Sequence, residues 1–265
     1  MRENGIRVRH KRRYKVTTDS KHGLPVADNL LDRNFTPTAP NQVWTSDITY
    51  LWTDEGWLYL AIVLDLFNRE VVGWSLKPRM TSDIATDALT MAWFRKRPAT
   101  GLMHHSDRGS QYASHVFQEK LKEYGMVCSM SRKGNCWDNA PTESWFNSFK
   151  NERVHGFRYA THADIRASSF EYIEVFYNRK RQHSTLDYRS PIQFLRDWLR
   201  EQPQEKTSSI KPTLWQTKNR GKLRPPQPNL RISSRIRPQG ERPTCQNMIC
   251  GALFQRLAAF NLISY

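Results

Sequence analysis

The chain has 265 residues, a length that accommodates one sizeable domain with extensions or two small domains. Hydrophobic residues make up 38% of the chain and aromatic residues 12%, which is enough to build a core and excludes a wholly disordered protein. No apolar run approaches the roughly 20 residues that a membrane-spanning helix needs. The basic N-terminal residues lack the apolar stretch of a secretory signal, so we expect a cytoplasmic protein that does not enter a membrane.

The formal net charge of +16 is concentrated at the two ends of the chain. Residues 1–40 carry +5, residues 41–200 carry +3, and residues 201–265 carry +8. Basic ends around a nearly balanced middle suit a polyanionic partner such as nucleic acid, although basic tails that contact only solvent would have the same composition. We therefore predict a basic arm over 1–40, a globular domain over 41–200, and a disordered, Pro-rich basic tail over 201–265.

The hydrophobic pattern predicts secondary structure in the order βββαβαβ, followed by further helices. Strands are predicted at 43–52, 57–67, 71–76, 102–106 and 126–130. Helices are predicted to begin near Ser82, Ser114, Asn139, Thr161 and Ser190. Residues 131–138, which contain Gly134-Asn135, are expected to form a mobile loop. This order predicts an α/β domain with a mixed five-stranded sheet flanked by helices.

Three acidic residues lie at positions where a carboxylate is unexpected unless it has a structural or chemical role. Asp47 lies in the middle of a predicted strand, Asp107 ends the fourth strand, and Glu143 lies in the first turn of the helix that begins at Asn139. A strand-end Asp can simply cap a turn, and a first-turn Glu can simply complement the helix dipole. If the first and fourth strands are neighbours, however, Asp47 and Asp107 meet near the sheet centre, and a helix crossing the sheet can present Glu143.

Converging carboxylates repel one another and need cations between them. Hard oxygen ligands select Mg²⁺ or Mn²⁺, which also accept substrate phosphate as a ligand. Two such ions a few ångströms apart are a known arrangement for phosphodiester chemistry. The sequence therefore predicts a site for two Mg²⁺ or Mn²⁺ ions, formed by Asp47, Asp107 and Glu143.

Several motifs around these residues resemble the DDE transposases of bacterial insertion sequences, whose core is similar to retroviral integrases. They are WTSDITY at 44–50, HSDRGSQY at 105–112, NCWDNAP at 135–141, ESWF at 143–146, and YNR at 177–179 followed by His183. The resemblance covers about residues 1–198. It implies a ribonuclease H-like fold, DNA as the partner, and a metal-binding catalytic triad of Asp47, Asp107 and Glu143.

The chain departs from that family pattern at both ends. Members usually carry a helix-turn-helix region before the core, often supplied by an upstream reading frame, whereas this chain begins just before the arm that leads into the core. The resemblance also ends after Trp198, so residues 201–265 fit translation past an original stop. We therefore expect a truncated copy, with an upstream-frame helix-turn-helix protein as a further partner and a homo-oligomer when assembled on DNA.

Basic residues near the triad are candidate DNA contacts. Lys150 lies seven residues after Glu143 on one helical stripe and could hold a DNA phosphate, although a solvated Lys is the simpler alternative. A second group follows at a helix end, where the helix dipole alone would favour cations. It comprises Arg179, Lys180, Arg181 and His183. Asp65, which precedes the turn at Asn68-Arg69, is expected to cap that turn and pair with Arg69 rather than bind metal.

We therefore expect a nucleoid-associated transposase that uses metal ions to cleave DNA at the 3′ ends of an element and to transfer the strand to target DNA. Two alternatives remain open. A ribonuclease H-like nuclease would hydrolyse DNA without joining it, and a strand-transfer assay separates it from a transposase. An inactive DNA-binding remnant would keep the triad and lack the reaction.

Overall fold

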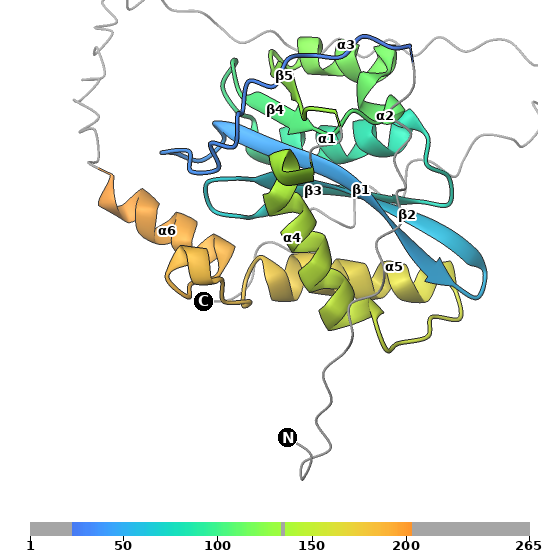
Figure 1. Ribbon diagram of the computed structural model, residues 1–265. Helices are drawn as coiled ribbons and strands as arrows, with labels where there is room; N and C mark the ends of the chain where they lie inside the picture. The colour runs from blue at the N-terminus through green and yellow to red at the C-terminus, as the bar shows by residue number, and fades with distance from the viewer. Residues whose placement is uncertain (1–22, 134–135, 203–265) are drawn as a thin grey trace, which may run out of the picture. The chain divides into compact units, whose positions relative to one another are not determined.

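A computed structural model of the chain describes residues 23–133 and 136–202 (Figure 1). Its sheet has five strands in the order β3-β2-β1-β4-β5. The strands are β1 (Val43–Thr53), β2 (Gly56–Asp65), β3 (Val71–Lys77), β4 (Met103–Ser106) and β5 (Val127–Met130). The first three form an antiparallel meander, whereas β4 pairs parallel to β1 and β5 pairs parallel to β4. This mixed sheet confirms the predicted ribonuclease H-like α/β fold.

Side chains along β1 point alternately to the two faces of the sheet, and each face carries its own hydrophobic core. Trp44 packs with the core beneath α1 (Ser82–Lys96) and α3 (His115–Glu123), whereas Leu51 belongs to the core beneath α4 (Ala140–Phe149) and α5 (His162–Phe170). Figure 1 shows these two pairs of helices on opposite sides of the sheet. The strand β2 is buried along nearly its whole length, as its continuous apolar sequence predicts.

Gly73 allows α1 to approach the sheet closely. A Cβ atom at this position would lie 2.2 Å from the carbonyl oxygen of Ala88 and 2.7 Å from the backbone nitrogen of Ala92. Only a residue without a side chain fits between β3 and α1 at that distance. The short helix α2 (Ser110–Ala113) precedes α3, and the Ser114 hydroxyl caps α3 by accepting from the Phe117 amide, as predicted.

The helices on the other face follow the predicted starts with two differences. Thr161 and Asp164 form the expected capping box of α5, and this helix continues into a wider π-helical segment (Glu171–Tyr177). Asn139 precedes α4, but its side chain does not cap the helix. The last helix, α6 (Pro191–Glu201), is only half-buried: its Phe194 and Trp198 pack against Phe67.

Residues 23–42 contain no helix or strand, and part of this segment packs on the domain. Leu31 is 4% exposed and joins the core beneath α4, and its backbone amide and that of Leu30 donate to the Ser129 hydroxyl of β5. The boundary between arm and core at residue 40 stays a prediction. The rest of the predicted arm, residues 1–22, and the predicted tail beyond residue 202 lie outside the described residues. None of the helices in the described ranges is long and apolar enough to cross a membrane.

Candidate active site

The pairing of β1 with β4 brings Asp47, in the middle of β1, beside Asp107, which directly follows the end of β4. Ser46 is the register partner of Ser106 in this parallel pair, and each aspartate is the next residue along its chain. Asp47 accepts a hydrogen bond from the Ile48 amide at 2.7 Å, and Asp107 accepts one from the Gly109 amide at 2.9 Å. Both side chains therefore have a fixed direction, and both residues are half-buried.

Two hydrogen bonds connect the start of α4 to β1 directly before Asp47, and a third joins the two α4-side residues to each other. The hydroxyl oxygens of Thr45 and Thr142 lie 2.7 Å apart, and the Thr142 hydroxyl also donates to the Asn139 side-chain oxygen at 3.0 Å. The Asn139 side chain donates to the Ser46 carbonyl at 3.1 Å. Asn139 thus joins helix to strand instead of capping the helix. Because Glu143 follows Thr142, this connection holds the exposed Glu143 on the side of β1 that carries Asp47.

The three carboxylates affect one another electrostatically. The pKa of Asp47 lies well above its usual value because of burial and the negative charges of Asp107 and Glu143. The hydrogen bond from the Ile48 amide and the charge of Lys150 partly oppose this shift. Burial and the charge of Asp107 raise the pKa of Glu143. The sequence prediction that these residues converge from two strands and a helix therefore agrees with their arrangement.

The donor chemistry of this cluster suits a divalent cation. Oxygen ligands from carboxylates are what Mg²⁺ and Mn²⁺ prefer, and a cation would relieve the repulsion that raises the Asp47 pKa. In the described ranges, no three His, Cys, Asp or Glu side chains stand close enough together to hold one ion as they are.

Lys150 lies at the end of α4 and points toward β1, the strand that carries Asp47. Its Nζ lies 4.7 Å from the centre of the Tyr50 ring, a cation–π contact. Burial lowers the pKa of this half-buried Lys150, and the charge of Asp47 opposes that shift. Lys150 is therefore not the freely solvated surface lysine that was the alternative for this position.

Tyr112 is a residue of the site that the sequence interpretation missed. Its side chain is buried in the core beneath α1 and α3, and its hydroxyl has no hydrogen-bond partner among the described residues. Burial and the charges of both aspartates raise its pKa. Tyr112 lies in the HSDRGSQY motif, but its aromatic character suggested a core residue, and its hydroxyl gave no separate signal.

Two consecutive histidines of β4 point to opposite faces of the sheet, and each forms buried hydrogen bonds. His104 Nε2 lies 2.7 Å from the Ser46 hydroxyl, and His105 lies between the hydroxyls of Ser129 and Ser131 at 2.9 and 3.1 Å. Burial lowers the pKa of His104 to about 3 and that of His105 to about 4. Both are therefore neutral near pH 7, and these bonds give them a structural role.

Asp138 holds the segment before α4 in place, contrary to the expected mobility of residues 131–138. Its carboxylate accepts from the side chains of Asn29 and Arg33, and from the backbone and side chain of Arg132. The Asp138 side chain is fully buried, and these donors lower its pKa. Asp138 lies in a 3₁₀ turn (Cys136–Asn139) that leads directly into α4, so it fixes the start of α4. Residues 134–135 lie outside the described residues.

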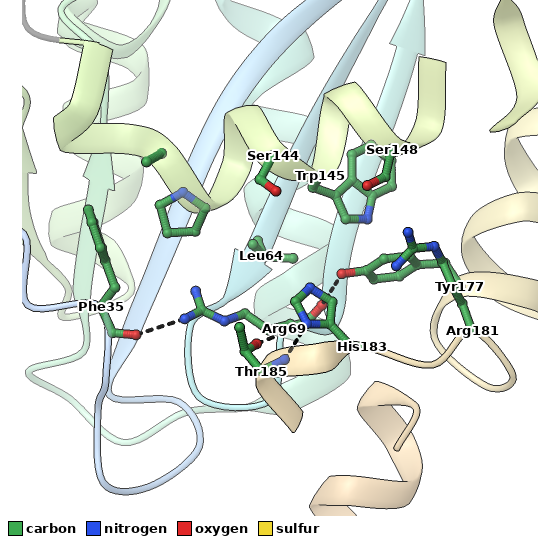
Figure 2. Close-up of a pocket in the computed structure, with 12 residues that line it drawn as sticks. Phe35, Leu64, Arg69, Ser144, Trp145, Ser148, Tyr177, Arg181, His183 and Thr185 are labelled. Carbon is green, nitrogen blue, oxygen red and sulfur yellow. Dashed lines mark hydrogen bonds between the residues drawn. The ribbon is translucent and has the colours of Figure 1, made fainter. Parts of the chain in front are cut away.

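The second group of basic candidates lies away from the triad. Arg179 and Lys180 are exposed, whereas Arg181 forms hydrogen bonds of 2.7 to 3.0 Å with Glu152. Arg181 and His183 line a cavity beside α4, where His183 accepts from the Thr185 amide (Figure 2).

The expected turn cap at Asp65 is present, but its expected partner is engaged elsewhere. Asp65 accepts from the backbone amides of Phe67 and Asn41 at 2.9 and 2.8 Å. Arg69 donates to the Phe35 carbonyl at 3.0 Å. Asp65 is thus a structural carboxylate of the turn after β2.

Comparison with known proteins identifies the family. The sequence matches the integrase core domain family over residues 37–136 and again over residues 143–199. It is 48% identical over 193 residues to the insertion element IS600 uncharacterized 31 kDa protein of Shigella sonnei, a match that covers 73% of this chain and 71% of that protein. It is 50% identical over 195 residues to transposase InsF for insertion sequence IS3A of Escherichia coli strain K12, covering 73% and 67% respectively.

The chain belongs to the insertion-sequence transposases with an integrase core domain. Among solved structures, it is similar to the HTLV-2 integrase catalytic core domain in complex with magnesium, in its trimeric form. That match has 19% sequence identity and a TM-score of 0.46, and it covers 59% of this chain and 97% of the other. The two segments matched to the integrase core domain family include Asp47, Asp107 and Glu143.

Proposed function

We propose that this chain carries the catalytic core of a transposase that cleaves DNA at the ends of an insertion sequence and joins the freed ends to target DNA. Asp47, Asp107 and Glu143 would hold Mg²⁺ or Mn²⁺ ions, two in number when DNA is bound. The observation that carries this proposal is the mutual effect of three carboxylates from three separate elements, in a chain of the transposase family.

Two ions would supply activation of the attacking oxygen and stabilisation of the leaving one. In the first step water attacks a phosphodiester, and the broken P–O bond leaves a 3′-hydroxyl and a 5′-phosphate. In the second step that 3′-hydroxyl attacks a phosphodiester of the target, so one P–O bond forms as another breaks. No nucleotide hydrolysis is needed to drive this exchange.

Each residue has a distinct part in this scheme. Asp47 interacts with both other carboxylates and would help to hold the ions, while the exposed Glu143 can approach DNA from α4. Lys150 would hold a phosphate beside the reacting bond, because its ammonium already lies within the field of Asp47. The protein then acts mainly by positioning the strands and neutralising charge.

The proposal extends to the partners of the chain. Its DNA would be the element ends and the target, with Arg179, Lys180, Arg181 and His183 contacting the backbone from the end of α5's extension. We propose a homo-oligomer on DNA, because two element ends must be joined to one target. Recognition of the ends would depend on a helix-turn-helix protein from an upstream frame, since base readout commonly uses a recognition helix.

Cleavage and strand transfer on a labelled duplex that carries the element's terminal repeat test this function. We expect Mg²⁺-dependent nicking and joining, and a loss of at least a thousandfold in Asp47→Asn, Asp107→Asn and Glu143→Gln, with DNA binding nearly unchanged. Asp65→Asn, a buried carboxylate outside the triad, is the matched control and should stay active. Nicking without joining would identify a nuclease, and metal-independent binding alone would identify an inactive remnant.

A further inference from the structure

A cavity of about 230 Å³ lies beside α4, next to the face that carries Glu143. Its wall is formed by α4, by the turn after β2 and by the segment that precedes α6. Figure 2 shows Ser144 and Ser148 pointing down from α4 toward Arg69 and His183 on the opposite wall. Trp145, Tyr177 and Arg181 complete the polar part of the lining.

The polar groups of this cavity are nearly all hydrogen-bond donors. The lining has guanidinium, indole, imidazole and hydroxyl groups, and none of the described residues that line it is acidic. Two of the donors are buried and have no partner among the described residues, namely Nη1 of Arg69 and Nε1 of Trp145. Trp145 is 3% exposed, so its unpaired N–H cannot turn to bulk water. Leaving buried donors unpaired costs free energy, a cost that an acceptor in the cavity would remove.

The charge at the cavity comes mainly from Arg69. Arg181 already forms hydrogen bonds to Glu152, so much of its charge is neutralised. Arg69 makes one hydrogen bond to a neutral backbone carbonyl, that of Phe35, and keeps its other terminal nitrogen buried. Burial lowers the pKa of His183, and the positive charges of Arg69 and Arg181 lower it further. The cavity is therefore positively charged and offers donors to an oxyanion.

We propose that this cavity binds one phosphate group of the DNA backbone, held by the Arg69 guanidinium and the Trp145 indole N–H, with the Ser144 and Ser148 hydroxyls at its rim. The inference rests on the proposed function for its ligand, DNA, but the site lies outside the triad. A phosphate oxyanion has the acceptors that this donor set lacks, and a guanidinium fork matches its geometry.

The volume favours a single group of a polymer over a whole small molecule. Typical small-molecule pockets enclose about 300–1,000 Å³, and this cavity is smaller. It can therefore admit a phosphate with part of its sugar, while the rest of the strand stays on the surface.

The position on α4 fits a strand that also reaches the triad. Ser144 and Ser148 form one stripe of the helix, and Glu143 and Lys150 form the neighbouring stripe, about 100° away. A strand crossing α4 can therefore reach both the cavity and Glu143.

The indole N–H signal of Trp145 tests this site directly. The full chain is prepared with ¹⁵N-labelled tryptophan, and Trp145→Phe identifies the signal among those of the 9 tryptophans. Inorganic phosphate and a short duplex are added separately in EDTA, at constant ionic strength, so that no cleavage occurs. We expect the Trp145 signal to shift saturably with both ligands. Arg69→Gln should weaken this response at least tenfold. It should also reduce the slope of log affinity against log salt concentration for duplex binding by about one.

Arg166→Gln is the matched control for Arg69→Gln. Arg166 also donates through one terminal nitrogen to a backbone carbonyl, that of Leu76, and it lies outside the cavity. We expect this variant to respond like the parent chain. If Arg69→Gln does not fold, Ser144→Glu places a carboxylate at the rim from an exposed position and should abolish the shift, whereas Gln193→Glu on α6 should not.

Three results would overturn the proposal. They are a Trp145 signal that stays in place while the duplex binds by fluorescence anisotropy, a shift that survives both cavity variants, and a response to free phosphate but not to DNA. None of these results bears on the triad, because no metal or cleavage is involved. Conversely, loss of cleavage in triad variants leaves the phosphate response of Trp145 intact, so the two proposals fail separately.

Discussion

The hydroxyl oxygens of Thr45 and Thr142 lie 2.7 Å apart and join the strand that carries Asp47 to the helix that carries Glu143. Both threonines are buried, and the Thr142 hydroxyl also donates to Asn139. Each threonine stands within two residues of a carboxylate of the candidate site. The spacing of the carboxylates therefore depends on a hydrogen bond between residues that do not contact the reacting atoms.

Thr142→Val keeps the side-chain shape and removes this hydroxyl. Because Thr45 and Asn139 then keep buried polar atoms without partners, we expect a loss of about 1–3 kcal/mol in the free energy of unfolding. Cleavage should fall at least tenfold, because Glu143 loses its fixed position. Urea denaturation and the cleavage assay measure the two effects. Thr86→Val on α1, which removes a hydroxyl bonded to the Ser82 carbonyl, is the control and should cleave like the parent chain. Full activity in Thr142→Val would contradict this role.

Asp138→Asn tests the fixation of the segment before α4. The buried carboxylate accepts from Arg132, Arg33 and Asn29, and removing its charge leaves two arginines without their partner. We expect a loss of about 3 kcal/mol in stability, measured by thermal melting. Asp54→Asn, which breaks an exposed ion pair with Arg158, should cost less than about 1 kcal/mol. Equal effects of the two variants would show that Asp138 does not anchor the segment.

The same carboxylate predicts a pH dependence of stability. The pKa of Asp138 is lowered in the folded chain, so its stabilising contribution is fully present above its ordinary pKa near 4 and is lost as the pH falls toward the folded value. Asp138→Asn should therefore lose stability mainly above pH 4, and its difference from the parent chain should shrink in more acidic buffer. A difference that grows on acidification would contradict the assignment.

The low pKa values of His104 and His105 predict a loss of folding stability that begins at a higher pH than the loss expected from Asp138. Their folded pKa values of about 3 and about 4 lie below the ordinary value near 6.5, so the unfolded chain binds more protons between these limits. Stability should then fall as the pH drops below about 6.5, by about 1.4 kcal/mol per pH unit for each histidine. Urea titrations from pH 7 to pH 4.5 measure this slope. His104→Gln should reduce the slope by the contribution of one histidine, about 1.4 kcal/mol per pH unit. An unchanged slope would contradict the prediction.

Much of the fold could be predicted from local sequence. The β-branched and aromatic runs gave the strands, Ser114, Thr161 and Ser190 cap helices as expected, and the apolar continuity of β2 indicated a buried central strand. Such signals depend on a residue and its near neighbours, so one sequence suffices to find them.

Features that depend on distant contacts escaped prediction. Asp138 was assigned to a mobile loop because Gly134-Asn135 indicates a turn, yet its partners Asn29 and Arg33 lie more than a hundred residues away. Asn139 has the sequence of a helix cap, but the Ser46 carbonyl takes its side chain. The two buried donors of the cavity, on Arg69 and Trp145, likewise come together only through the packing of α4 on the turn after β2.

The most direct test of the central claim, that Asp47, Asp107 and Glu143 form a metal site, is the thermal stability of the parent chain and Asp47→Asn with and without Mn²⁺. The pKa of Asp47 is raised, so its ionisation costs stability as the pH rises above its ordinary value near 4. In EDTA at pH 7.5, Asp47→Asn should therefore melt at a higher temperature than the parent chain. Saturating Mn²⁺, at about 100 times its dissociation constant, should add about 2.7 kcal/mol to the parent chain and much less to the variant. A variant that melts lower in EDTA and gains as much from Mn²⁺ as the parent chain would contradict the account.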